Sequence, residues 1–125
     1  IATDHAPHHY DEKEREFADA PNGIVGLETA LAVNIHWLVA SRIIDLATLI
    51  DRMACAPAKL FHLPGGTLRA GAQADVTVFD PATSWTVDPA GFRSKGRNTP
   101  YAGHTLTGRV HATIVGGDVI HRLQR

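Results

Sequence analysis

The residues best able to do chemistry lie at the start of the chain, in the run Thr3-Asp4-His5-Ala6-Pro7-His8. Asp4 ends a short apolar stretch and precedes a long loop, the position at which a (β/α)₈ barrel builds its active site. A carboxylate there can ligate a divalent metal ion and take a proton from metal-bound water. It could equally cap the loop by accepting hydrogen bonds from nearby backbone N–H groups. The residue chemistry leaves both interpretations of Asp4 open.

Changes in the spacing of apolar side chains along the chain indicate the elements that position Asp4. Residues 1–4 are compatible with a β-strand, and residues 5–23 form a long connection without periodicity, which is usually functional or disordered. From Gly26, apolar side chains recur at three- and four-residue steps. This spacing predicts a helix whose buried stripe contains Leu27, Leu31, Ile35 and Leu38.

Two further helices and a β-module are predicted downstream. Asp45 is a suitable N-cap for a second helix, and Pro57 suits the first turn of a third, short helix. Residues 74–79 are rich in strand formers and end in a turn signal, Asp80-Pro81. Residues 110–120 place two β-rich arms around a Gly-Gly pair, which predicts a hairpin. The pattern is therefore an α/β chain that changes character near residue 63.

Composition excludes several classes of protein. The chain has 125 residues with 12 Lys+Arg against 13 Asp+Glu, and it contains no basic block that would suggest nucleic acid or an anionic membrane as partner. Polar residues interrupt the apolar stretches, so no membrane span is expected. The single cysteine, Cys55, permits no intrachain disulfide, and a reducing cytoplasm fits best. Because Ile1 opens the chain inside a predicted strand, we expect a fragment of a longer protein.

Motifs along almost the whole chain resemble class I dihydroorotases of the amidohydrolase superfamily. The Asp-His-Ala-Pro-His run is followed by Pro21-Asn22-Gly23 and by a Gly-Leu-Glu-Thr stretch at residues 26–29. Further matches are the Gly-x-x-Ala-Asp-Val stretch at residues 71–76 and the Ser-Lys-Gly-x-Asn-Thr-Pro segment at residues 94–100. The first run and the last segment favour dihydroorotase over hydantoinase or allantoinase. The Gly-x-x-Ala-Asp-Val stretch is typical of the whole superfamily.

The resemblance implies a fold and a division of the chain. Residues 1–62 are expected to be the last strand, active-site loop and closing helices of a metal-dependent (β/α)₈ TIM barrel. Residues 63–125 are expected to be part of a small C-terminal β-sandwich.

The resemblance also implies an activity, the zinc-dependent reversible hydrolysis of the cyclic amide of dihydroorotate in pyrimidine biosynthesis, with N-carbamoyl-aspartate as the open form. Zinc acts as Lewis acid and hydroxide source, and Asp4 matches the carboxylate that binds metal, accepts the proton and passes it to the leaving nitrogen. His8 matches a histidine that contacts the substrate carboxylate. Asn22 and Gly23 match loop positions whose backbone groups bind substrate. The remaining ligands of one or two zinc ions lie outside this chain, which alone is expected to be inactive.

Alternatives to this interpretation stay open. A hydantoinase-like cyclic amidase would share the fold and the metal, and a non-catalytic dihydroorotase-like subunit would scaffold aspartate transcarbamoylase. Besides the small-molecule substrate, a homodimer and a transcarbamoylase are possible partners. His8 could be a loop histidine bonded to a backbone carbonyl, and Gly23 could serve only a turn. We expect His5 to be structural in the loop, His9 to lie on the surface, and Cys55 to pack as a small hydrophobe.

Overall fold

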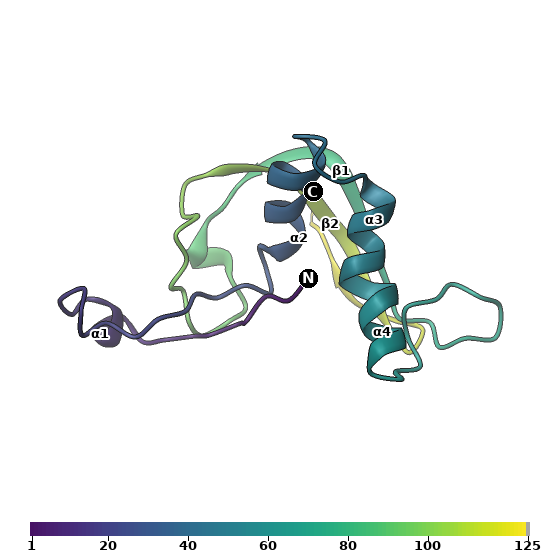
Figure 1. Cartoon of the computed structure of the whole chain (residues 1–125), viewed down its shortest axis with the longest axis horizontal. Coiled ribbons are helices and arrows are strands. Elements are labelled where there is room, and N and C mark those ends of the chain that lie inside the picture. The colour runs from purple at the N-terminus through teal and green to yellow at the C-terminus, as the bar shows by residue number, and fades with distance from the viewer. Residues whose placement is uncertain (125) are drawn as a thin grey trace.

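The computed structural model describes residues 1–124 and has helices and strands in two successive parts of the chain (Figure 1). The helical elements are α1 (Tyr10–Lys13), α2 (Ala30–Asn34), η1 (Ile35–Val39), α3 (Leu46–Ile50), η2 (Asp51–Cys55), α4 (Ala56–Leu60) and η3 (Pro89–Gly91). The strands are β1 (Val76–Thr86), β2 (Thr105–Val115) and β3 (Asp118–Arg122). The predicted α/β class is confirmed.

The helices expected at Asp45 and Pro57 are one continuous helix, formed by α3, η2 and α4. The expectation of a separate short helix at Pro57 was therefore wrong. The backbone N–H of Ala56 bonds the carbonyl of Asp51, which is the wider i→i−5 turn of a π-helix. This change of hydrogen-bond register falls directly before Pro57, whose missing N–H is accommodated there without ending the helix.

Asp45 caps the N-terminus of this helix, as the sequence predicted. Its carboxylate accepts a hydrogen bond from the backbone N–H of Thr48 at 2.7 Å. Hydrogen bonds from the side chain and the backbone of Thr48 hold the pKa of the Asp45 carboxyl below its ordinary value. The charged form of Asp45 therefore stabilises the start of the helix.

Replacing this cap is expected to produce a pH-dependent loss of stability. Because the folded pKa of Asp45 is lowered, its contribution is complete above the ordinary carboxyl pKa and is lost as the pH falls through the lowered one. Asp45→Ala should thus lower Tm at neutral pH, and the difference from the parent should shrink in acid. Thermal unfolding of the complete protein across pH measures this, with Asp51→Ala as control because its carboxylate only approaches Arg52 Nε at 3.9 Å. A difference that does not change with pH would contradict the prediction.

The strands form one antiparallel sheet in the order β1-β2-β3. The strand predicted to end at the Asp80-Pro81 turn instead continues to Thr86, with a break in register between Asp80 and Ser84. The Asp80 carboxylate accepts hydrogen bonds from the Ala82 N–H at 2.8 Å and the Thr83 hydroxyl at 2.6 Å. The expected turn is therefore present, but as a local bulge from which the chain resumes pairing with β2.

The predicted hairpin is confirmed as β2 and β3 joined at Gly116-Gly117. Both glycines have positive φ, 59° and 96°, as a tight two-residue hairpin turn requires.

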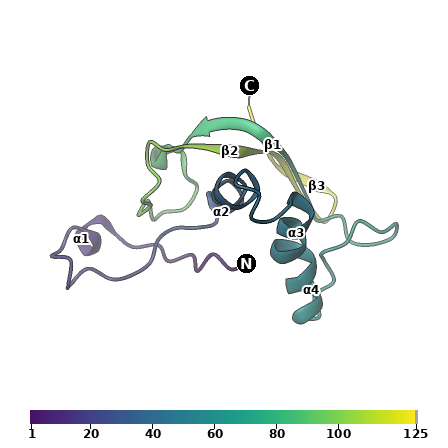
Figure 2. The same ribbon diagram turned by 45° about the horizontal axis from the view of Figure 1, so that its top comes forward.

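The sheet curves over α2, and the core lies between them (Figure 2). The buried cluster contains Val25 and Ala32 together with Val87, Phe92 and Leu106, of which Leu106 is fully buried. Both predicted parts of the chain therefore contribute side chains to one core. The division at residues 1–62 and 63–125 stays a prediction.

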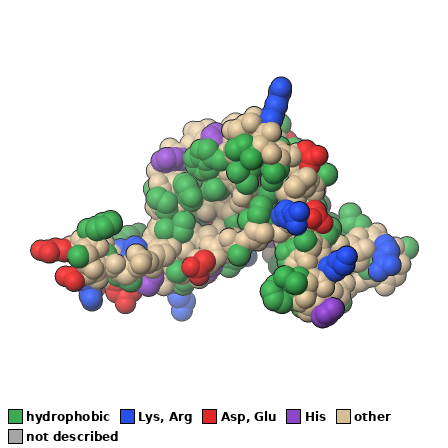
Figure 3. Space-filling view, viewed as in Figure 1, with side chains coloured by type: hydrophobic (Ala, Val, Ile, Leu, Met, Phe, Trp, Pro, Cys, Tyr) green, Lys and Arg blue, Asp and Glu red, His purple; other side chains and the backbone are tan. Residues whose placement is uncertain are grey.

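Residues 1–4, all within the described part of the chain, do not form the predicted strand. Asp4 has a φ of 44°, which is outside the β region, and a strand needs a neighbour along its length. The only β-type pairing here is an isolated parallel bridge between His5 and Ile24, extended by the hydrogen bond from Ala6 N–H to Ile24 O at 2.9 Å. The chain then projects from the body as a long loop that carries α1, with charged side chains gathered at its tip (Figures 1 and 3).

Candidate functional site

Asp4 presents an exposed carboxylate at the start of the site loop, which we define as residues 5–25. Among the described residues 1–124 its side chain has no hydrogen bond or ion pair, so it does not cap the loop in the way the alternative interpretation required. Its left-handed backbone, at a φ of 44°, is uncommon for a residue other than glycine, although aspartate and asparagine tolerate it better than most. An exposed carboxylate in a strained backbone is available to a ligand.

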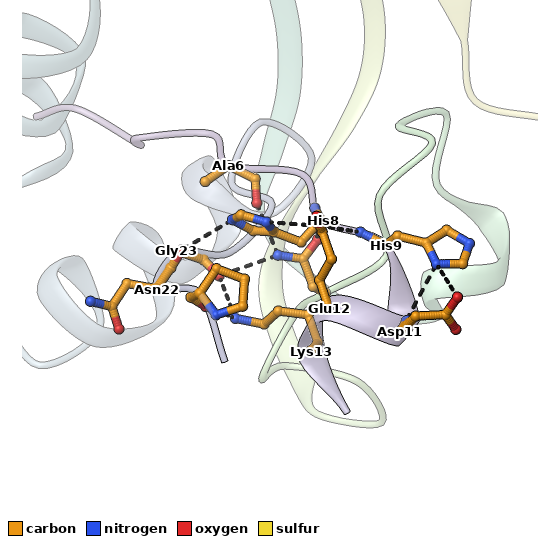
Figure 4. Close-up of polar contacts among 10 residues, drawn as sticks. Ala6, His8, His9, Asp11, Glu12, Lys13, Asn22 and Gly23 are labelled. Atoms are coloured by element: carbon orange, nitrogen blue, oxygen red, sulfur yellow. Dashed lines mark hydrogen bonds and ion pairs between the residues drawn. The ribbon is translucent and has the colours of Figure 1, made fainter. Parts of the chain in front are cut away.

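His8 is held by a partner at each ring nitrogen (Figure 4). Its Nε2 lies 3.0 Å from the backbone oxygen of Asn22, and its Nδ1 lies 3.3 Å from Glu12 Oε2. A carbonyl and a carboxylate only accept hydrogen bonds, so both are satisfied when His8 donates from both nitrogens, as the imidazolium form does. The backbone N–H of His9, followed by the His8 side chain, lowers the pKa of Glu12 and keeps this carboxylate charged. His8 is thus bonded to a backbone carbonyl, as the alternative interpretation described, and to bind an anion it would have to give up one of these two partners.

Asn22 and Gly23 lie against His8, so the structure brings three predicted site residues together (Figure 4). Gly23 has a φ of 105°, and a Cβ at this position would lie 2.6 Å from the Cβ of Ala6. Only glycine therefore lets the two arms of the site loop approach this closely. Lys13 Nζ donates to the backbone oxygens of Pro21 at 2.7 Å and Gly23 at 3.1 Å, which closes the loop from the other side. The fourth predicted site residue, Asp4, makes no polar contact with these three in the described part of the chain.

Asn98 is a residue of this site that sequence reasoning missed. Its side-chain Nδ2 donates to Ala6 O at 2.9 Å and to Gly23 O at 3.2 Å, and its Oδ1 accepts from His8 N–H at 3.0 Å. Its backbone oxygen accepts from Val25 N–H at 3.1 Å. Asn98 lies in the Ser-Lys-Gly-x-Asn-Thr-Pro segment that the sequence singled out, and that was the available signal. Nothing in the sequence indicated which loop the segment contacts.

The same segment is fastened to the start of α2 by Glu28. The Glu28 carboxylate accepts from the backbone N–H groups of Arg93 at 2.9 Å and Ser94 at 3.0 Å. A Cβ on Gly96 would lie 2.5 Å from Pro7 Cβ, so this glycine allows the backbone to lie directly on the site loop. The two sequence motifs that most favoured dihydroorotase are thus in direct contact.

His5 is structural in the loop, as expected. Its Nδ1 accepts from the N–H groups of Gly26 at 3.1 Å and Leu27 at 3.4 Å, which are unpaired donors at the entry to the helix. Its Nε2 lies 3.4 Å from the hydroxyl of Ser94. His9 is exposed, as predicted, and accepts from Asp11 N–H at the start of α1.

Two other expectations turn out differently. Cys55 is exposed rather than packed. Leu27, predicted to lie in a buried stripe, is 68% exposed because the helix begins only at Ala30. The ring of Trp37, a residue 41% exposed, packs against His36 and Tyr101 with centroids 4.9 Å and 5.7 Å away.

The described residues do not make a metal site by themselves. Within residues 1–124, no cluster of three or more His, Cys, Asp or Glu side chains could hold a metal ion. A catalytic zinc site uses at least three protein ligands, and Asp4 offers one. Within the same residues, no helix is long and apolar enough to cross a bilayer.

Comparison with known proteins identifies relatives of nearly the whole chain. The dihydroorotase of Geobacter metallireducens is 50% identical over 122 residues, which are 98% of this chain, and that of Anaeromyxobacter dehalogenans is 54% identical over 121 residues. The chain spans 28% of the length of each of these relatives. No family model matches the chain.

Solved structures with the same fold carry the names dihydropyrimidinase and hydantoinase. A dihydropyrimidinase from Brevibacillus agri superposes with a TM-score of 0.85 at 27% identity and covers 95% of this chain. The L-hydantoinase from Arthrobacter aurescens superposes with a TM-score of 0.79 at 34% identity over 86% of this chain. This chain covers 27% and 24% of those two proteins. The sequence relatives and the structural neighbours thus carry two related enzyme names.

Proposed function

Since this chain is homologous to dihydroorotases along almost its entire length, we propose that it forms part of a dihydroorotase, the enzyme that reversibly hydrolyses the cyclic amide of dihydroorotate. The observation that carries the proposal is the sequence identity: it is 50–54% to these dihydroorotases, against 27–34% to the superposed dihydropyrimidinase and hydantoinase. Homology over about a quarter of an enzyme supports the activity of the whole protein as a proposal.

The fold proposal follows from the same homology. Residues 1–62 would complete a metal-dependent (β/α)₈ barrel, and residues 63–125 would contribute their sheet to a small β-sandwich. An acid followed by a long loop is the arrangement found at the C-terminal face of such barrels. The absence of a strand at residues 1–4 fits this proposal, because a barrel strand is formed by pairing with neighbours on both sides.

Asp4 is proposed as the catalytic carboxylate and as one metal ligand. Its exposed carboxylate, without a polar partner among residues 1–124, would fit one position in a zinc site of one or two ions whose other ligands would come from outside these residues. Zinc held there would supply a Lewis acid for the ring carbonyl and a source of hydroxide. Asp4 would take up the proton of the attacking water and deliver it to the ring nitrogen as the amide C–N bond breaks.

His8, Asn22 and Gly23 are proposed to bind the substrate. His8 would contact the substrate carboxylate, which would compete with Glu12 for the Nδ1 donor across the present 3.3 Å contact. The Asn22-Gly23 backbone would present its polar groups to the substrate ring, and Gly23 allows the main chain to approach closely. The site would thus offer an imidazole N–H donor to a small amide ligand that is itself an anion.

The activity is tested by assaying the complete protein with dihydroorotate and with hydantoin, before and after removal and restoration of zinc. Turnover of dihydroorotate, and of N-carbamoyl-aspartate in the reverse direction, is the expected result. The hydantoinase-like alternative is favoured by the superposition on dihydropyrimidinase and hydantoinase structures. Turnover of hydantoin alone would replace our proposal by that one, and turnover of neither would favour a non-catalytic subunit.

His8→Ala is expected to weaken substrate binding and also to slow turnover. It removes the charge-assisted donor and leaves the Asn22 carbonyl without its present partner, so we expect KM to rise by about tenfold or more. Steady-state kinetics on dihydroorotate measures the effect. His9→Ala is the matched control, because the neighbouring ring is 71% exposed and points away from the site. A variant with the parental KM would count against the carboxylate contact.

A further inference from the structure

The site loop has little internal support for the residues it carries. Backbone bonding between its two arms, residues 5–9 and 21–25, is limited to the bridge between His5 and Ile24 and the bond from Ala6 N–H to Ile24 O. The other bonds between the two sides of the loop come from the side chains of His8 and Lys13. The helix between the arms, α1, spans four residues and buries none of them. A loop with few buried contacts is expected to open easily unless another segment holds it.

Asn98 holds the loop in place with hydrogen bonds from both its side chain and its backbone. On the first arm it contacts Ala6 O and His8 N–H, and on the second arm it contacts Gly23 O and Val25 N–H. Each of these four atoms is a backbone group, so the contacts fix the course of the main chain rather than one rotamer. The arms come together around a single amide group from a segment 75 to 92 positions away in the sequence.

We propose that Asn98 is a positioning residue for the substrate site, one that fixes the spacing between His8 and the Asn22-Gly23 backbone and thereby sets the affinity for substrate. The inference rests on the proposed function, since it assumes that these loop residues bind dihydroorotate. Asn98 does not contact Asp4, so the step that breaks the amide bond should depend on it much less than binding does.

The chemistry of the three side-chain contacts requires an amide side chain. Nδ2 faces two carbonyl oxygens, and Oδ1 faces an N–H group, so one terminus must donate and the other must accept. Aspartate has the same shape but would place a second oxygen against the Ala6 and Gly23 carbonyls. Alanine would remove the side-chain partner of Ala6 O and of His8 N–H, and would leave Gly23 O with Lys13 Nζ alone.

The kinetic test compares Asn98→Asp and Asn98→Ala with the parent in the complete, zinc-loaded protein. Each variant is expected to raise KM for dihydroorotate by about tenfold or more, which is the loss of one to two hydrogen bonds to partly buried groups. We expect kcat to stay within about threefold. Asn34→Ala is the matched control, because its side chain makes one partly buried bond, to Ala30 O at 2.8 Å, away from the loop. An unchanged KM in both Asn98 variants, or a fall in kcat alone, would overturn the proposal.

Amide hydrogen exchange tests the hold of Asn98 on the loop independently of the proposed activity. It also distinguishes a local loosening of the loop from general destabilisation. In Asn98→Ala, peptides covering residues 5–9 and 21–25 should exchange faster, while the helix over residues 46–60 should exchange as in the parent. Faster exchange throughout would mean general destabilisation and would overturn the positioning role. A parent protein that does not turn over dihydroorotate would refute the proposed function and the effect on KM with it, whereas a local change in exchange would still support the hold of Asn98 on the loop.

Discussion

Replacing Asp4 with asparagine is expected to lower dihydroorotate turnover by roughly 10²–10⁴-fold, the range that a positioned general acid–base group supplies. The amide cannot accept the proton, and it is a poorer metal ligand than the carboxylate. The fold should be unaffected, because the side chain is exposed and has no polar partner in residues 1–124. Asparagine also tolerates the left-handed backbone that Asp4 adopts, at a φ of 44°.

The measurement is kcat together with Tm and bound zinc for the complete protein. Asp11→Asn provides the control, since it removes a carboxylate of the adjoining site loop that is 86% exposed and forms an ion pair with His9 at 3.3 Å. Near-normal turnover by the Asp4 variant would refute its proposed role as proton carrier. Lost turnover with normal zinc content would assign the role to proton transfer rather than to metal binding.

Gly23→Ala is expected to disrupt the site loop through two separate effects. A side chain at a φ of 105° costs about 1–3 kcal/mol in backbone strain. Its Cβ would also lie 2.6 Å from Ala6 Cβ, and such overpacking costs typically about 1–3 kcal/mol. Relieving the contact must move the second arm away from His8, so substrate binding should weaken together with stability.

Gly117→Ala separates the two effects. Gly117 has a similar φ of 96°, but a Cβ there would meet nothing within 4 Å. This variant should therefore show the backbone strain alone and retain the parental KM for dihydroorotate. We expect thermal unfolding to show a larger loss for Gly23→Ala, by about 1–3 kcal/mol. Equal losses in the two variants, with KM unchanged, would mean that the close contact between Gly23 and Ala6 is not important.

Local sequence signals predicted the features that depend on neighbouring residues. The Asp45 cap and the hairpin at Gly116-Gly117 follow from side-chain and backbone preferences that act over two or three residues. The helix over residues 46–60 was divided wrongly at Pro57, because a π turn that absorbs a proline has no simple sequence pattern. The strand at residues 1–4 was predicted from composition, but a strand exists only through its pairing partners.

The candidate site was predictable to the extent that one loop contains it. His8, Asn22 and Gly23 lie within the site loop and are brought together by it. The roles of Asn98 and Glu28 were not predictable, because their bonds join segments separated by 65 to 92 positions, and such pairs leave no periodic pattern. The family motif at residues 94–100 indicated that this segment matters, but only the structure shows that it contacts the site loop.

The bond between Asn98 and the first arm of the loop has a consequence for the order of events during synthesis. The ribosome makes the loop first, and the residue that fixes Ala6 emerges 92 positions later. At elongation rates of about 5–20 residues per second, the nascent loop is without this partner for several seconds. Contacts of such sequence separation also form late in folding, because chain entropy must be overcome before they add stability. The site loop therefore reaches its final shape only after residue 98 has been made, and a chain that stops before residue 98 would lack the group that sets it.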